Sequence, residues 1–174
     1  MSIAPIERQA EAARMRGLRA NSFAAIVILL IEYGLGVWVS LYGHLPTSDH
    51  GASLATGFAR AVSQGPAGLS IHAVLGAILV ISAITAVVRA ALVRRPAMVG
   101  ATAVGLLAIV LAVLSGASFV GDDSNGASMS MAVGAGLAIG AYALVLLLSA
   151  GAAETVTASQ ADGNHVPPAS RVQP

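Results

Sequence analysis

The chain contains no cysteine and no lysine, and only 10% of its residues are charged. Without cysteine it can form no disulfide, no Cys-ligated zinc or iron–sulfur site, and no thiol nucleophile. A soluble domain averages about 25% charged residues because its surface must meet water. Lipid is therefore the expected solvent of this chain. The net charge of +1 gives no reason to expect nucleic acid as a partner.

Recognisable catalytic motifs are also lacking. The sequence has no Gly-rich phosphate loop, no Ser/His/Asp arrangement and no zincin motif. We therefore expect a protein that is not an enzyme.

Hydrophobic residues are what the sequence has in excess, at 56% of 174 residues. A helix needs roughly 20 apolar residues to cross the hydrocarbon core of a bilayer, and four segments reach this length. Each must be helical, since isolated strands would leave backbone groups unpaired in lipid. The predicted spans cover about residues 20–42, 70–92, 97–120 and 127–150.

These spans predict an all-α membrane fold, a four-span antiparallel transmembrane helix bundle occupying residues 20–150. An Arg-rich cytoplasmic arm at 1–19 precedes it. The polar segment at 151–174 contains three prolines and is predicted to be a disordered cytoplasmic tail.

The outer loop at 43–69 is long for such a bundle. Within it, Leu54, Phe58 and Val62 share one face at helical spacing, which predicts a short amphipathic helix on the membrane surface. That helix is interpreted either as a lid over the outer mouth of the bundle or as a connector that rests on the membrane.

Arginine sets the predicted orientation. Seven arginines flank the first span or border the connection between the second and third, whereas the two opposite loops hold only Arg60. The positive-inside rule then places both termini in the cytoplasm of a multi-pass protein of the cell membrane. The seven are Arg8, Arg14, Arg16, Arg19, Arg89, Arg94 and Arg95.

Small residues mark the faces on which membrane helices approach one another closely. Gly136 and Gly140 follow Ala132 at a spacing of four in the fourth span, the clearest such stripe in the chain. Gly36 and Gly76 occupy similar positions in the first and second spans. We expect all four glycines at helix contacts, within the chain or with a membrane protein partner or second copy.

Glu32 interrupts the first apolar run. At about 1.5 Å per residue, it lies about 18 Å beyond Ala20, close to the predicted midplane. Buried acids usually stay protonated or find partners, and intramembrane acids are candidates for function. Ser82 and Thr85 of the second span are expected at similar depth. The two interpretations are a proton-carrying or ligand-binding site and a neutral hydrogen-bonded lock between the first two spans.

Histidine gathers on the outer side. His44 follows the first span, His72 begins the second, and His50 lies in the loop between them. Two imidazoles at one depth could ligate haem iron from opposite faces, or join His50 around a divalent metal. The alternative interpretation is that they are ordinary polar residues of the membrane interface.

Three stretches, "EYGLGVWVSLYGHLPTSDHG", "GPAGLSIHAVLG" and "SGASF", resemble uncharacterised four-helix integral membrane proteins of actinobacteria. The resemblance covers about Arg19 to Ser149 and implies the fold without an activity. A fainter likeness to four-helix haem b membrane bundles rests on His44 and His72 alone and implies haem b as a cofactor. Those bundles usually place their histidines more regularly.

Three functions therefore stay open. The first is a structural or accessory subunit of a larger membrane assembly. The second is a haem- or metal-binding electron-transfer protein that uses His44 and His72. The third is a small proton-linked transporter that uses Glu32.

Overall fold

The computed structural model describes residues 5–42, 53–122 and 125–163, and within these ranges the protein has five helices and no strand. Four of the helices contain a segment long and apolar enough to cross a membrane. The helices are α1 (Pro5–Tyr42), α2 (Leu54–Gln64), α3 (Ala67–Val93), α4 (Pro96–Asp122) and α5 (Asn125–Gly163).

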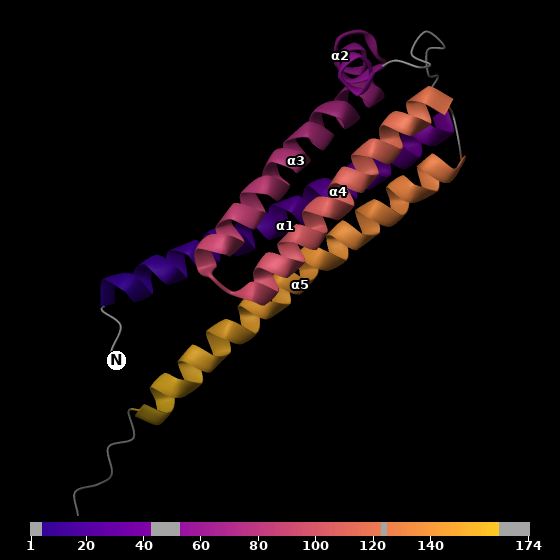
Figure 1. Ribbon diagram of the computed structural model, residues 1–174. Coiled ribbons are helices and arrows are strands. Elements are labelled where there is room, and N and C mark those ends of the chain that lie inside the picture. Colours follow the sequence, from indigo (N-terminus) through magenta and orange to yellow (C-terminus); the bar gives the residue numbers. More distant parts are fainter. Residues whose placement is uncertain (1–4, 43–52, 123–124, 164–174) are drawn as a thin grey trace, which may run out of the picture.

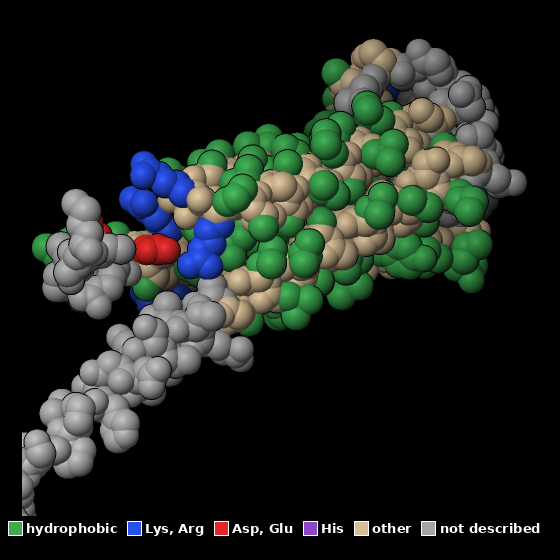
Figure 2. All heavy atoms as spheres, turned by 60° about the horizontal axis from the view of Figure 1, so that its bottom comes forward, with side chains coloured by type: hydrophobic (Ala, Val, Ile, Leu, Met, Phe, Trp, Pro, Cys, Tyr) green, Lys and Arg blue, Asp and Glu red, His purple; other side chains and the backbone are tan. Residues whose placement is uncertain are grey.

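The four candidate spans leave large apolar side chains on the outside of the molecule. Ile81, Leu107 and Leu147 are each at least 65% exposed, and Figure 2 shows hydrophobic side chains over the length of one face. Exposure of such an apolar surface to water would cost free energy, whereas contact with the hydrocarbon of a membrane would not. The spans are Gln9–Val39, Ala67–Val93, Pro96–Ser118 and Gly126–Gly151.

The long helices contact one another as a ring. α1 packs against α3 and α5, α4 packs against α3 and α5, and α2 packs on α3 (Figure 1). The main core cluster draws on all four long helices and is rich in alanine, so the helix axes can approach closely. It comprises Ala25, Leu29, Leu79, Ala83, Ala86, Ala108, Ile109, Ala138 and Tyr142.

Two hydrogen bonds fix the register of α1 against α3. Asn21 Nδ2 donates to the carbonyl oxygen of Ser82 at 3.0 Å, and Arg14 Nη1 donates to that of Leu92 at 3.4 Å. Higher residue numbers on α1 therefore pair with lower numbers on α3.

The ends of α1 and α5 differ from the predicted boundaries. α1 already begins at Pro5, so most of the predicted arm at 1–19 is the first part of the spanning helix. α5 continues to Gly163, so the predicted disordered tail begins as helix, and its last part lies outside the described residues. Both extensions are rich in Ala, Glu, Gln or Arg, which favour helix, and no proline interrupts them. A change in polarity therefore does not end either helix.

The junction between α3 and α4 follows the sequence closely. Arg94 adopts a left-handed conformation with φ of 59° and ends α3. Pro96 begins α4, where its fixed φ suits the first helical turn and its missing N–H leaves no bond unmade.

The predicted contact face of α5 is wrong. Gly136 and Gly140 are exposed, and a Cβ at either would meet no atom within 4 Å. Gly134 makes the close approach instead, because a Cβ there would lie 2.8 Å from the carbonyl oxygen of Ala108 on α4. Gly134 and Gly136 are two residues apart, which corresponds to about 200° around a helix. The predicted face with Gly136 and Gly140 therefore points nearly away from α4.

Candidate functional site

A cavity of about 710 Å³ lies between the helices, and α2 forms part of its wall. Figure 1 shows α2 at one end of the molecule. All five helices contribute to its wall, which consists mainly of aliphatic side chains and glycines. Ligand pockets typically measure about 300–1,000 Å³, so a small organic molecule fits this volume. The polar side chains in the described wall are Glu32, Tyr33, Ser53, His72 and Ser128.

Glu32 and His72 form an ion pair in this wall. Nδ1 of His72, on α3, contacts Oε2 of Glu32, on α1. Nδ1 has no aligned hydrogen bond among the described residues, and the contact joins opposite charges when the imidazole is protonated. The residue Glu32 is only 7% exposed, whereas 27% of the His72 side chain is exposed.

The second oxygen of Glu32 is unsatisfied. Oε1 is buried and has no hydrogen-bond partner among the described residues. A carboxylate can accept hydrogen bonds at both oxygens, and a buried charge is costly unless it is fully partnered. The cavity wall therefore contains an acid with one buried oxygen that no described residue partners.

The partners that the sequence suggested for Glu32 are wrong. Thr85 donates from Oγ1 to the carbonyl of Ile81 at 2.8 Å within its own helix, and Ser82 is level with Asn21. The prediction took residue 20 as the edge of the first span and so placed Glu32 opposite the middle of α3. The observed register places Glu32 opposite the second turn of α3, where His72 lies.

Gly36 and Gly76 both border the site, in different ways. A Cβ at Gly36 would lie 3.6 Å from Cε1 of His72, so Gly36 is at the α1–α3 contact, as predicted. A Cβ at Gly76 would meet no atom within 4 Å, and Gly76 lines the cavity. The missing side chain at Gly76 therefore contributes open space and not a close contact.

The helix predicted within the outer loop is present as α2, and it forms part of the cavity wall. Gly57, Phe58 and Ala61 line the cavity. The Oγ of Ser70, in the first turn of α3, donates to the carbonyl of Ala61 at 2.7 Å and ties α2 to α3. This position against the cavity favours the lid interpretation over the surface connector.

Trp38 lies close to the start of α3. A Cβ at Gly68 would overlap the indole ring, so this approach requires glycine. The ring centroid of Trp38 is 6.5 Å from that of Tyr42 in a tilted arrangement. The only tryptophan of the chain therefore lies at the α1–α3 contact, close to residues that line the cavity.

The predicted metal or haem site is described only in part. His44 and His50 lie outside the described residues, which leaves His72 as the one member of the predicted set that the structure places. Within the described ranges, no three side chains of the His, Cys, Asp or Glu type come together. The Nδ1 atom of His72 is in contact with Glu32, and haem ligation by His44 and His72 stays a prediction.

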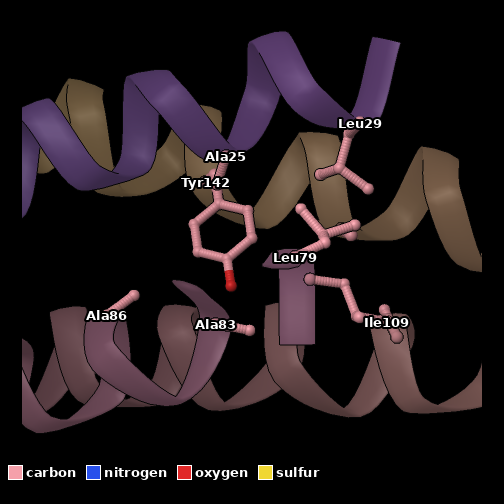
Figure 3. Close-up of a cluster of buried hydrophobic side chains, with 9 residues drawn as sticks. Ala25, Leu29, Leu79, Ala83, Ala86, Ile109 and Tyr142 are labelled. Carbon is pink, nitrogen blue, oxygen red and sulfur yellow. The ribbon is translucent and has the colours of Figure 1, made fainter. Parts of the chain in front are cut away.

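Tyr142 is a central residue that the sequence interpretation missed. It is fully buried, and Figure 3 shows its ring in the core with Ala25 of α1 and with Ala83 and Ala86 of α3. Its hydroxyl has no hydrogen-bond partner among the described residues. A signal existed: this tyrosine stands within an aliphatic span, far from the membrane interface where Tyr is usually enriched.

The comparison of this chain with protein families, with curated proteins and with solved structures found no match.

Proposed function

We propose that the chain is a multi-pass membrane protein that binds a small, mainly apolar molecule in the cavity and couples binding to a proton of the Glu32–His72 pair. The observation that carries this proposal is the ion pair in the wall of a cavity of about 710 Å³. This develops the hypothesis of a small proton-linked transporter and gives Glu32 a titratable partner.

The physical basis is the cost of charge in an apolar wall. An isolated carboxylate there would be strongly disfavoured, and the imidazolium of His72 neutralises it. Imidazole is the side chain that most readily gains or loses a proton near neutral pH. A ligand that changes the charge or polarity beside Glu32 therefore changes how firmly the pair holds its proton.

The proposed topology is an antiparallel bundle in the plasma membrane with both termini in the cytoplasm. Its support is the opposed numbering of α1 and α3 contacts and the gathering of arginines at one end, where Arg95 Nη2 lies 3.7 Å from Glu11 Oε1. Figure 2 shows basic side chains at that end, and α2 lies at the other. In this topology the cavity lies toward the outer leaflet.

The experiment fills part of the cavity and keeps both members of the pair. Gly76→Leu projects a side chain into the open space of the cavity, whereas Gly136→Leu adds the same atoms to the exposed face of α5. A panel of small apolar compounds, both neutral and charged, is added to the detergent-purified protein, and the thermal unfolding midpoint is measured for each. At least one compound should stabilise the wild type and Gly136→Leu but not Gly76→Leu.

Equal stabilisation of all three proteins by every compound that acts would contradict the proposal, because binding would then not involve the cavity. Loss of effect in Gly136→Leu as well would also contradict it, since that residue lies away from the site.

A structural or accessory role is a second candidate, supported by the exposed glycines of α5. Gly136 and Gly140 leave a strip of bare backbone on the outer face, which another transmembrane helix could approach closely. Gly136→Leu would then break a complex recovered from membranes, whereas Gly76→Leu would not. The haem hypothesis is tested separately by the Soret band of protein expressed with added haem.

A further inference from the structure

We infer that the cavity binds a lipophilic organic cation, which takes the place of the proton held between Glu32 and His72. This inference rests on the proposed function and specifies its ligand class. It depends on the charges of the cavity wall, on the unsatisfied oxygen of Glu32 and on the apolar remainder of the wall.

Few titratable groups line the cavity. Apart from Glu32 of α1 and His72 of α3, the described wall contributes only the phenol of Tyr33, on α1, which is neutral near neutral pH. The residues of α2, α4 and α5 that line the cavity are all uncharged. Arg60 of α2 is exposed and does not line the cavity. In the described wall, Glu32 is therefore the only side chain that can carry a negative charge opposite a bound cation near neutral pH. The described wall contains no arginine that could pair with a bound anion.

The need to keep the site electrically neutral favours a cation as the ligand. With its proton the pair carries no net charge, as a carboxylate beside an imidazolium. A cation that binds beside the carboxylate releases that proton to solvent and leaves His72 as a neutral imidazole, so the site again carries no net charge. An anion would need a second proton on the pair, and a neutral molecule would displace none. One cation for one proton keeps the apolar wall free of uncompensated charge in both states.

The rest of the wall suits an apolar body around that charge. Phe58 of α2 and Tyr33 of α1 present aromatic rings, and aromatic faces attract cations. When Glu32 is ionised, its carboxylate, whose Oε1 is buried and has no hydrogen-bond partner among the described residues, is a negative centre beside the cavity. A strongly hydrated cation such as Na⁺ would lose its water shell against aliphatic side chains, whereas a lipophilic cation has little hydration to lose.

The test uses two ions of nearly equal shape and opposite charge. Binding of tetraphenylphosphonium and of tetraphenylborate to the detergent-purified full chain is measured by equilibrium dialysis. Subtraction of the values for Gly76→Leu removes partition into micelles, which both proteins share. The measurements are made at about pH 8 and about pH 6, and Glu7→Gln serves as the control for Glu32→Gln because Glu7 is exposed and outside the wall.

The expected result is cavity-dependent binding of tetraphenylphosphonium at least about tenfold tighter than that of tetraphenylborate. Its affinity should fall on acidification by up to about tenfold per pH unit, since one proton competes for the site. Glu32→Gln should remove both the preference and the pH dependence, and Glu7→Gln should retain both. The pH dependence of the wild type tests the exchange even if Glu32→Gln does not fold.

Different failures are distinguishable. Cavity-dependent binding that is equal for the two ions, or stronger for tetraphenylborate, would overturn the inference and leave the proposed function standing. Cavity-dependent binding that does not change with pH would overturn the inference and also the proton coupling in the proposed function, and would leave only binding in the cavity. Both the inference and the proposed function would be overturned if neither ion bound differently to the wild type and to Gly76→Leu, and if no compound of the panel stabilised the wild type.

Discussion

His72 of α3 contacts Glu32 of α1 through its Nδ1 atom, and this ion pair joins the two helices within the wall of the cavity. In the proposed function, the same two side chains would both join the helices and supply the titratable group. The lock and the proton site, which the sequence offered as alternatives for Glu32, both stay predictions, and the contact with His72 is the feature on which either now depends.

The first prediction concerns the coupling between these residues. Glu32→Gln and His72→Gln should each lower the unfolding midpoint in detergent, because each leaves a polar partner in an apolar wall. The double variant should be less destabilised than the sum of the two, by about 0.5–3 kcal/mol. Additive effects in this double-mutant cycle would contradict direct pairing.

A second prediction tests the contact face of α5. Gly134→Ala should destabilise the protein by about 1–3 kcal/mol, because its Cβ would press on the backbone of α4. Gly136→Ala is the matched control and should be neutral or slightly stabilising, since alanine favours helix over glycine. Thermal unfolding of the two variants compares them. The reverse order would restore the face predicted from the small-residue stripe.

The buried hydroxyl of Tyr142 gives a third prediction. Tyr142→Phe keeps the ring that fills the core and removes an oxygen without a hydrogen-bond partner in the described structure. The variant should be as stable as the wild type or more stable by about 1 kcal/mol. Tyr142→Ala should lose about 3–5 kcal/mol, because it leaves a cavity. A marked loss of stability in Tyr142→Phe would mean that the hydroxyl has a partner.

A fourth prediction uses Trp38 as an intrinsic reporter. Gly68→Ala places a methyl group where the indole ring lies, so the ring must move. The tryptophan emission maximum and its quenching by acrylamide should both change. Gly57→Ala, which adds a methyl group to open space on α2, should leave both unchanged. Identical spectra for Gly68→Ala and the wild type would show that the two residues are not in contact.

Much of the fold could be predicted from hydrophobicity alone. Four long apolar runs produce the four candidate spans, Pro96 marks the start of α4, and the spacing of Phe58 and Val62 indicates α2. These features follow from local composition and backbone chemistry, which the sequence displays directly.

The pairing of the site could not be predicted in the same way. It depends on the register of α1 against α3, and hydrophobicity leaves that register free by several residues. Counting from residue 20 predicts Glu32 beside Ser82 and Thr85. Because α1 begins at Pro5 and continues through the polar arm, Asn21 and not Glu32 lies beside Ser82. The choice between Gly134 and Gly136 was also hidden, since small residues occur on more than one face of α5 and only the packed structure shows which face meets α4.

The central claim, that ligand binding in the cavity draws on a proton of the Glu32–His72 pair, is tested most directly by titration calorimetry. The heat of tetraphenylphosphonium binding is measured at one pH in two buffers of different ionisation enthalpy, with Gly76→Leu as the blank. We expect a buffer-dependent heat that corresponds to release of about one proton per bound cation by the wild type, and none by Glu32→Gln. Cavity-dependent binding with the same heat in both buffers would contradict the claim.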